Sequence, residues 1–306
     1  MTMRSLRAGS RGRGAAAAGA LARVKSPAPL TSIEHRLVRL ALAEDLGRGD
    51  LTTEALIPPG RPGRAAFVAR EPLVVAGMEA AAEVFRALDP KARIRVLCPD
   101  GCAVRRGQRL AEVSGRLRAI LSGERTALNF LRHLSGIATA TRRFVRALAG
   151  TGCRLLDTRK TTPGMRVLEK AAVRAGGGLN HRIGLFDAVL IKNNHIDAVG
   201  GIENAVRRAR RRLRPGTPLE VEVRSLAELE EALSCGVDRV LLDNFSLSLL
   251  RRAVQRCAGR VQTEASGNIL LVNARAYART GVDFISVGAL THSAPAADIS
   301  LWVDVG

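Results

Sequence analysis

The sequence predicts an α/β protein in which an α+β N-terminal domain is followed by an incomplete α/β barrel of about six to seven parallel strands. In the second half of the chain, short apolar runs alternate with helical patterns, and such repeats form parallel sheets. In the first half, short apolar runs surround one helical segment, which is typical of an α+β unit. We therefore expect a basic tail over residues 1–28, an N-terminal domain over 29–136 and a barrel domain over 137–306.

The first 28 residues contain six basic residues and no acidic residue. Ala, Gly and Ser make up most of the remainder, so this composition predicts a disordered extension. An arginine-rich start without acidic residues is also found in organelle transit peptides, and this is the alternative interpretation.

The net charge of +20 suggests either a nucleic-acid partner or a compositional bias. Of the 48 basic residues, 43 are Arg, and aromatic residues, which would stack on bases, make up only 3%. We favour bias and expect no nucleic-acid partner. No apolar run reaches the roughly 18–20 residues of a membrane span. The five cysteines form no CxxC motif and predict reduced thiols in a cytoplasmic protein.

A helix is expected to begin at Thr31, with Ser32 as its N-cap and one apolar face formed by Ile33, Leu37, Leu40 and Leu46. Four strands should follow around a helix at residues 78–88, over residues 65–69, 73–76, 93–97 and 109–113. A long amphipathic helix should begin at Ser122 and run to about Leu148.

In the predicted barrel domain, apolar strands are expected at residues 155–156, 188–191, 221–223, 240–242, 262–265 and 284–287. Helical patterns follow three of them, at residues 226–233, 247–257 and 270–278. In parallel α/β barrels the active site lies at the carboxyl ends of the strands, so the residues after each strand are the candidate site.

The first strand ends carry cations: Arg159, Lys160, His181, Arg182 and Lys192. Arg binds carboxylates and phosphates through two parallel hydrogen bonds, and Lys adds a compact charge. Three of the five lysines lie within residues 160–192 of this arginine-rich chain, although Lys170 was expected to be a solvated helix residue. The cluster predicts a site for a small, strongly anionic substrate.

The later strand ends are acidic and then glycine-rich. Glu222 and Asp243 end neighbouring strands, where carboxylates can bind sugar hydroxyls, hold Mg²⁺ or stabilise a developing cation. Ser266-Gly267 and Gly288-Ala289 follow the last two strands, where backbone N–H groups commonly bind phosphate. Together the strand ends fit a phosphorylated sugar that reacts with an acidic partner.

Several segments resemble the quinolinate phosphoribosyltransferase family: ERTALNFLRHLSGIAT, DTRKTTPGMRVLEKAAVRAGGGLNHRIGLFDAVLIKNNHI, LEVEV, LLDNF, EASGNI and GVDFISVGALTHS. The similarity extends from about Ile33 to near the C-terminus. The resemblance implies a transferase of NAD biosynthesis, a nicotinate-nucleotide pyrophosphorylase. Such an enzyme transfers phosphoribose from phosphoribosyl pyrophosphate to quinolinate and releases pyrophosphate and carbon dioxide. It also implies Mg²⁺, a homodimer with shared active sites, and a cytoplasmic location.

The resemblance also implies residue roles, which divide the predicted site into three groups. Lys160, Lys192, Glu222 and Asp243 would be catalytic, with Glu222 and Asp243 holding Mg²⁺. Arg125, Arg159, His181 and Arg182 would bind the quinolinate carboxylates, and Ser266, Gly267, Gly288 and Ala289 would bind phosphate. Arg125 is expected in the first turn of a helix, where the helix dipole disfavours a cation, so we expect it to serve the neighbouring subunit's site.

Three alternatives remain at this stage. One is a related phosphoribosyltransferase with another acceptor, and another is a barrel aldolase in which Lys192 forms a Schiff base. The third is a nucleic-acid-binding protein, because of the net charge of +20.

Overall fold

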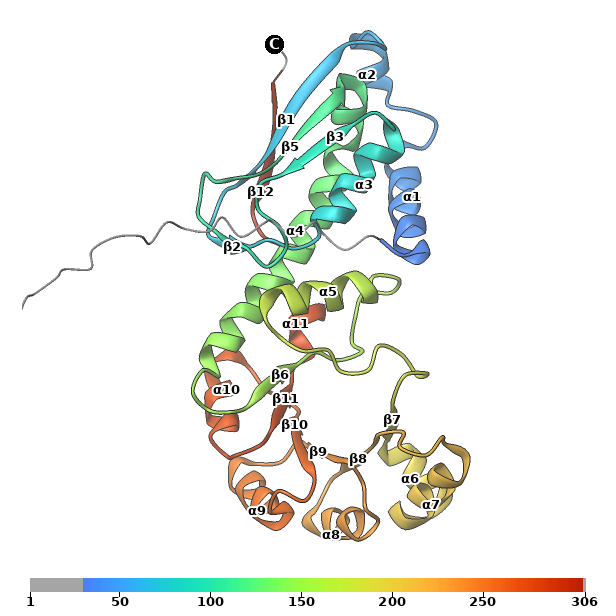
Figure 1. Ribbon diagram of the computed structural model, residues 1–306, viewed down its shortest axis with the longest axis vertical. Helices are drawn as coiled ribbons and strands as arrows, with labels where there is room; N and C mark the ends of the chain where they lie inside the picture. The colour runs from blue at the N-terminus through green and yellow to red at the C-terminus, as the bar shows by residue number, and fades with distance from the viewer. Residues whose placement is uncertain (1–29, 305–306) are drawn as a thin grey trace, which may run out of the picture.

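The structure, a computed structural model, describes residues 30–304. It consists of two units connected by the long helix α4 (Leu117–Ala147), which runs from the upper unit of Figure 1 into the lower one. Both predictions for residues 1–28, a disordered extension or a transit peptide, lie outside the described residues.

The upper unit contains a four-stranded antiparallel sheet with the order β12-β1-β5-β3 (Figure 1). Its strands are β1 (Pro62–Ala69), β3 (Arg93–Val96), β5 (Arg109–Arg116) and β12 (Ile299–Asp304). The other elements of this unit are α1 (Ser32–Leu46), α2 (Leu51–Leu56), α3 (Met78–Leu88) and the short pair β2 (Leu73–Val74) and β4 (Ala103–Val104). Phe67 of β1 and Phe85 of α3 are both fully buried, with ring centroids 6.1 Å apart, and join the helices to the sheet.

The strand β12 was not predicted. It pairs antiparallel with β1, where Ala65 lies opposite Val303 and Phe67 opposite Leu301. The chain therefore returns from the lower unit to complete the N-terminal sheet. A local sequence pattern indicates a strand but not its distant partner, and six residues give only a short pattern.

The cap and the buried face of α1 also differ from the prediction. Thr31, not Ser32, is the N-cap, because the Thr31 and Glu34 side chains each accept a hydrogen bond from the other residue's backbone N–H. The buried residues of this helix include Val38 and Leu42, whereas Leu40 is 66% exposed. The apolar spacing was therefore assigned to the wrong face.

Helix α4 begins at Leu117, five residues before the predicted Ser122. Gly123 lies within the helix and lets Val84 and Phe85 of α3 approach closely. Arg125 is consequently in the third turn of α4, and the argument from a first-turn cation was wrong. Its side chain is exposed.

The lower unit holds a six-stranded parallel sheet with the order β6-β11-β10-β9-β8-β7. The strands are β6 (Arg154–Leu156), β7 (Val189–Ile191), β8 (Leu219–Val223), β9 (Arg239–Asp243), β10 (Gln262–Ser266) and β11 (Phe284–Ser286). Within residues 30–304, β6 and β7 do not pair with each other. A single parallel bridge from Leu156 to Leu179 lies on the free side of β6. This arrangement confirms the predicted incomplete barrel.

The helices of this unit surround the curved sheet in Figure 1. They are α5 (Arg166–Gly176), α6 (Asn193–Val199), α7 (Ile202–Arg212), α8 (Leu226–Ser234), α9 (Leu247–Cys257), α10 (Leu271–Ala278) and α11 (Ala289–His292). Helix α9 has the predicted bounds, and α8 and α10 differ from theirs by one residue. All five residues of β8 are buried, so both faces of the sheet are covered here.

Gly176 allows α5 to pack tightly against α4. A Cβ atom at this position would lie 2.5 Å from Cβ of Thr141 and 2.6 Å from the carbonyl oxygen of Ala138. The first glycine of the GGG segment is therefore required by helix packing. Gly176 is also the last residue of α5, and the chain continues from it to His181 and Arg182.

We predict that Gly176→Ala lowers the free energy of unfolding by about 1–3 kcal/mol, because overpacking forces α4 and α5 apart. Urea denaturation would measure the change. Gly60→Ala is the matched control, since a Cβ atom at Gly60 has no neighbour within 4 Å and should leave stability unchanged. Equal stability of the two variants would contradict the packing argument.

Candidate active site

A cavity of about 780 Å³ opens at the carboxyl ends of the barrel strands. Eleven of the twelve predicted site residues line it: Arg159, Lys160, His181, Arg182, Lys192, Glu222, Asp243, Ser266, Gly267, Gly288 and Ala289. Arg125 is the exception, because it lies exposed on α4 and does not line the cavity. One chain therefore brings the cations, the acids and the glycine-rich loops into a single space.

Two loops supply four of the cations. Arg159 and Lys160 follow β6, whereas His181 and Arg182 follow the isolated bridge at Leu179. Nε of Arg159 is buried without a hydrogen-bond partner among the described residues. Burial and the neighbouring Arg159 guanidinium lower the pKa of Arg182. An anion between these two guanidinium groups would satisfy the free donor and relieve the repulsion.

A buried network holds these two loops together. The Asp157 carboxylate accepts hydrogen bonds from Nζ of Lys170, from Nδ2 of Asn180 at 2.6 Å and from the backbone N–H of His181 at 2.8 Å. Lys170 is only 1% exposed, so the expectation of a solvated helix residue was wrong. The sequence contained a signal for this role, since Lys170 is one of only five lysines.

The acidic residues lie on the neighbouring strands β8 and β9. Oε2 of Glu222 is 3.3 Å from Nζ of Lys192, which follows β7, and Oδ2 of Asp243 accepts a hydrogen bond from Nδ2 of Asn244 at 2.9 Å. Glu222 is 8% exposed, and both carboxylates line the cavity. Of the two acids, Glu222 therefore lies within hydrogen-bond distance of a cavity lysine.

The loops after β9 and β10 interlock. Asn244 and Asn268 adopt left-handed backbone conformations with φ of 56° and 51°. Gly267 has φ of 98°, and a Cβ atom there would overlap the Asn244 side chain. The backbone N–H of Asn244 donates to the carbonyl oxygen of Ser266 at 2.9 Å. Such left-handed turns turn successive N–H groups toward one side, as in anion-binding loops.

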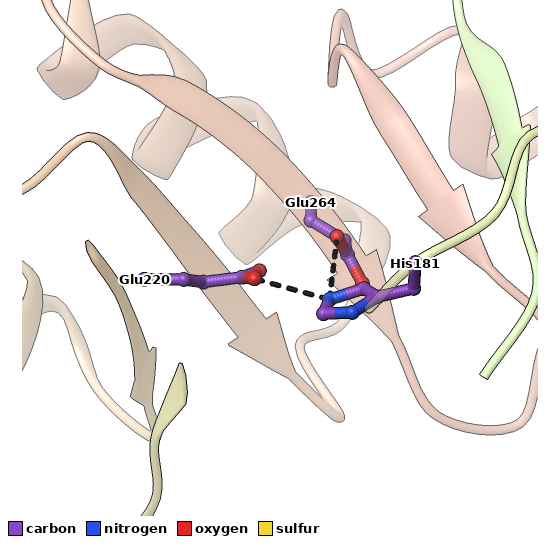
Figure 2. Close-up of side chains that lie close together, drawn as sticks. All are labelled: His181, Glu220 and Glu264. Carbon is purple, nitrogen blue, oxygen red and sulfur yellow. Dashed lines mark ion pairs between the residues drawn. The ribbon is translucent and has the colours of Figure 1, made fainter. Parts of the chain in front are cut away.

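Figure 2 shows a second buried cluster, formed by His181, Glu220 and Glu264. Nε2 of His181 lies 3.0 Å from Oε2 of Glu220 and 3.6 Å from Oε2 of Glu264, and Glu264 is fully buried. Nδ1 of His181 accepts the backbone N–H of Arg182 at 2.8 Å. Burial alone would lower the pKa of His181, but the two carboxylates outweigh it and raise that pKa. Nδ1 of the ring is therefore hydrogen-bonded, whereas Nε2 lies close to two carboxylates but makes no hydrogen bond within the described residues.

Comparison with known proteins agrees with this arrangement. The sequence model described as "Quinolinate phosphoribosyl transferase, N-terminal domain" matches residues 50–135, and the corresponding C-terminal domain model matches residues 137–302. The chain belongs to the quinolinate phosphoribosyltransferase family. The two matches meet within α4, the helix that connects the two units.

Curated members of the quinolinate phosphoribosyltransferase family are similar over most of their length. A probable nicotinate-nucleotide pyrophosphorylase (carboxylating) of Synechocystis is 44% identical, over 92% of this chain and 97% of its own. The enzyme of that name from Mycobacterium leprae is 47% identical, over 86% of this chain and 95% of its own. The solved nicotinate-nucleotide pyrophosphorylase of Francisella tularensis is 46% identical and superposes with a TM-score of 0.85, over 89% of this chain and 96% of its own.

In this member of the quinolinate phosphoribosyltransferase family, the ligand atoms of His181, Glu220 and Glu264 lie within 4.8 Å of one another, as in a metal site. A neutral imidazole that binds a metal through Nε2 carries its proton on Nδ1. Here Nδ1 accepts the Arg182 N–H, so the ring proton belongs on Nε2. The cluster therefore suits a shared proton better than a metal ion. Glu222 and Asp243 line the open cavity, where their oxygens could hold a metal ion.

Sequence reasoning missed several residues of the site: Thr158, Asn244, Asn268, Ser286 and His292 line the cavity, and Glu220 and Glu264 contact His181. Glu220 had a recognisable signal. In the LEVEV strand two Glu alternate with apolar residues, so both Glu face the barrel interior. Glu264 lies in the QTEAS strand, which has no such alternation with apolar residues, and its role depends on tertiary proximity to His181.

Glu264 predicts a pH dependence of stability. Burial and then the Glu220 carboxylate raise the pKa of Glu264 from 4.5 to about 7. A raised pKa stabilises the fold while Glu264 is protonated, and this contribution is lost as the pH rises through about 7. Glu264→Gln imitates the protonated form.

We therefore expect the stability of Glu264→Gln relative to the unchanged protein to rise between about pH 5 and pH 8, by roughly 3 kcal/mol. Urea unfolding at several pH values measures it. A difference that does not vary with pH would contradict the raised pKa.

Proposed function

We propose that this chain transfers phosphoribose from phosphoribosyl pyrophosphate to quinolinate with loss of a carboxylate, giving nicotinate mononucleotide, pyrophosphate and carbon dioxide. The observation that carries the proposal is that three kinds of group line one cavity. They are the cations on two joined loops, the carboxylates on β8 and β9, and the glycine-rich loops after β10 and β11. The family membership and the names of the relatives support the same reaction.

In this proposal the cationic loops bind the two carboxylates of quinolinate. The unpartnered Nε of Arg159 and the depressed pKa of Arg182 both favour an anion between them. Fixing the dianion at two points aligns its ring nitrogen with the sugar, which lowers the entropic part of the barrier. His181 also lines the cavity, and its Nδ1 accepts the backbone N–H of Arg182, so it supports the Arg182 backbone as well.

The carboxylates of Glu222 and Asp243 stabilise the sugar as positive charge develops at its reacting carbon. Their oxygens line the open cavity, and hard oxygen ligands of this kind suit Mg²⁺, so both fit as its ligands. When bound, Mg²⁺ neutralises charge on the leaving pyrophosphate. Lys160 and Lys192 line the same cavity and would hold the departing phosphates. The Ser266-Gly267 and Gly288-Ala289 segments would bind the phosphate at the other end of the sugar.

The direct test incubates the purified protein with quinolinate, phosphoribosyl pyrophosphate and Mg²⁺ and measures nicotinate mononucleotide. Nicotinate in place of quinolinate is the control, since it lacks the second carboxylate. Product from nicotinate and none from quinolinate would favour the related phosphoribosyltransferase with another acceptor. Product from neither compound would contradict the proposal.

We predict that Glu222→Gln and Asp243→Asn each lower kcat by roughly 100-fold, because each removes a charge that stabilises the transition state. Glu230→Gln, an exposed change on α8, is the matched control and should keep normal turnover. Near-normal kcat in both site variants would contradict their assigned role.

We further propose a homodimer in which Arg125 of each subunit completes the other subunit's site. The side chain is exposed on α4 and does not line its own chain's cavity, although the family resemblance assigns it to quinolinate. A cationic side chain with this placement is available to a second copy of the chain.

Mixing two inactive variants tests the shared site. Arg125→Ala and Arg182→Ala homodimers should each lose activity. A heterodimer purified through two different affinity tags contains one intact site of two, so we expect about half of the normal activity. Inactive heterodimers of verified composition would contradict the proposal.

We also propose a cytoplasmic location. All five cysteines lie in the described residues and are free, which is typical of a reducing compartment. Among residues 30–304, no helix has the length and apolar character needed to cross a membrane.

A further inference from the structure

Lys170 lies at the meeting point of the two loops that carry the cations. It belongs to α5, yet its side chain is 1% exposed and reaches the end of β6. Its Nζ donates one hydrogen bond to the Asp157 carboxylate and a second, of 3.0 Å, to the carbonyl oxygen of His181. One ammonium group therefore connects the residue two positions before Arg159 with the residue directly before Arg182.

The remaining contacts of this network have the same effect. The other partners of Asp157 are Asn180 and the backbone N–H of His181. Asn180 in turn donates from Nδ2 to the carbonyl oxygen of Lys170 at 2.9 Å. The backbone of His181 is consequently held from both sides, through its N–H by Asp157 and through its C=O by Lys170.

The charge of Lys170 matters as well as its reach. Asp157 is fully buried, and the stretch of residues 157–182 also contains Arg159 and Arg182. Burial raises the pKa of Asp157 and lowers that of Lys170, so each charge depends on the other. Without the ammonium group, the Asp157 carboxylate would be free to attract a guanidinium group needed by the substrate.

The residue type fits the space. A compact ammonium group has three donors and can serve two acceptors in a small buried volume, whereas the planar guanidinium of Arg is larger. The chain uses Arg at 43 of its 48 basic positions, and it keeps Lys here.

We propose that Lys170 is a positioning residue for quinolinate binding, which holds the Arg159 loop and the Arg182 loop in register through Asp157 and His181. This inference rests on the proposed function. It concerns the quinolinate end of the cavity only, because the phosphate-binding loops after β10 and β11 make none of these contacts.

The test compares Lys170→Met with Lys91→Met, an exposed change in the N-terminal unit. We expect Lys170→Met to raise KM for quinolinate roughly tenfold or more, with a smaller change in KM for phosphoribosyl pyrophosphate. Lys91→Met should change neither constant. A loss of kcat with both KM values unchanged would mean that fewer molecules are folded, and it would overturn the proposal.

The double variant Asp157→Asn/Lys170→Met separates stability from positioning. It leaves no unpaired buried charge, so its thermal stability should recover toward that of the unchanged protein. The link from Lys170 to His181 is still missing, so KM for quinolinate should stay high. Recovery of a normal KM would overturn the proposal, and this double variant remains informative if Lys170→Met does not fold.

Hydrogen exchange provides a measurement that does not require activity. The His181 N–H donates to Asp157, so residues 179–182 should exchange faster in the double variant than in the unchanged protein. Unchanged protection there would overturn the proposal. If the unchanged protein does not turn over quinolinate, the proposed function fails, and the exchange result still decides whether Lys170 orders these loops.

Discussion

A parallel sheet brings the carboxyl ends of all its strands to one edge, and the candidate active site depends on this constraint. Residues more than 100 positions apart, such as Arg159 and Gly288, line one cavity because their strands β6 and β11 are neighbours. Each strand contributes a short polar segment where its backbone pairing ends. The chemistry of the cavity is therefore distributed over the sequence, while its geometry is set by the sheet.

Charge balance is the second constraint on this cavity. The interior of the barrel contains buried carboxylates at Asp157, Glu220 and Glu264, each facing a cationic partner or His181. Other cations, such as Arg159, retain a buried donor with no partner among the described residues. Paired charges keep the loops in place, and unpaired donors are left for a ligand. The same stretch of chain thus contains both supporting and binding cations.

Much of the fold followed from local patterns. The six barrel strands and the helices at residues 78–88 and 247–257 were predicted, because periodic burial leaves a direct record in the sequence. The start of α4 was placed five residues too late, at Ser122 instead of Leu117. The buried face of α1 was predicted wrongly, because this helix has apolar residues on its exposed side as well as on its buried side. The site residues came from strand ends and family motifs. The Lys170 and Glu264 contacts depend on three-dimensional proximity, so no local pattern indicated them.

The pairing of β12 with β1 has a consequence for how the chain is made. Residues 62–69 leave the ribosome long before residues 299–304, yet they are neighbours in one sheet. Until residue 304 has been synthesised, β1 presents an unpaired edge, and edges of this kind attract other chains. The N-terminal unit therefore cannot complete its sheet cotranslationally ahead of the barrel, as N-terminal domains usually do. Its last folding step must wait until residues 299–304 have been synthesised, so an intermediate with an open edge at β1 persists while the barrel is made.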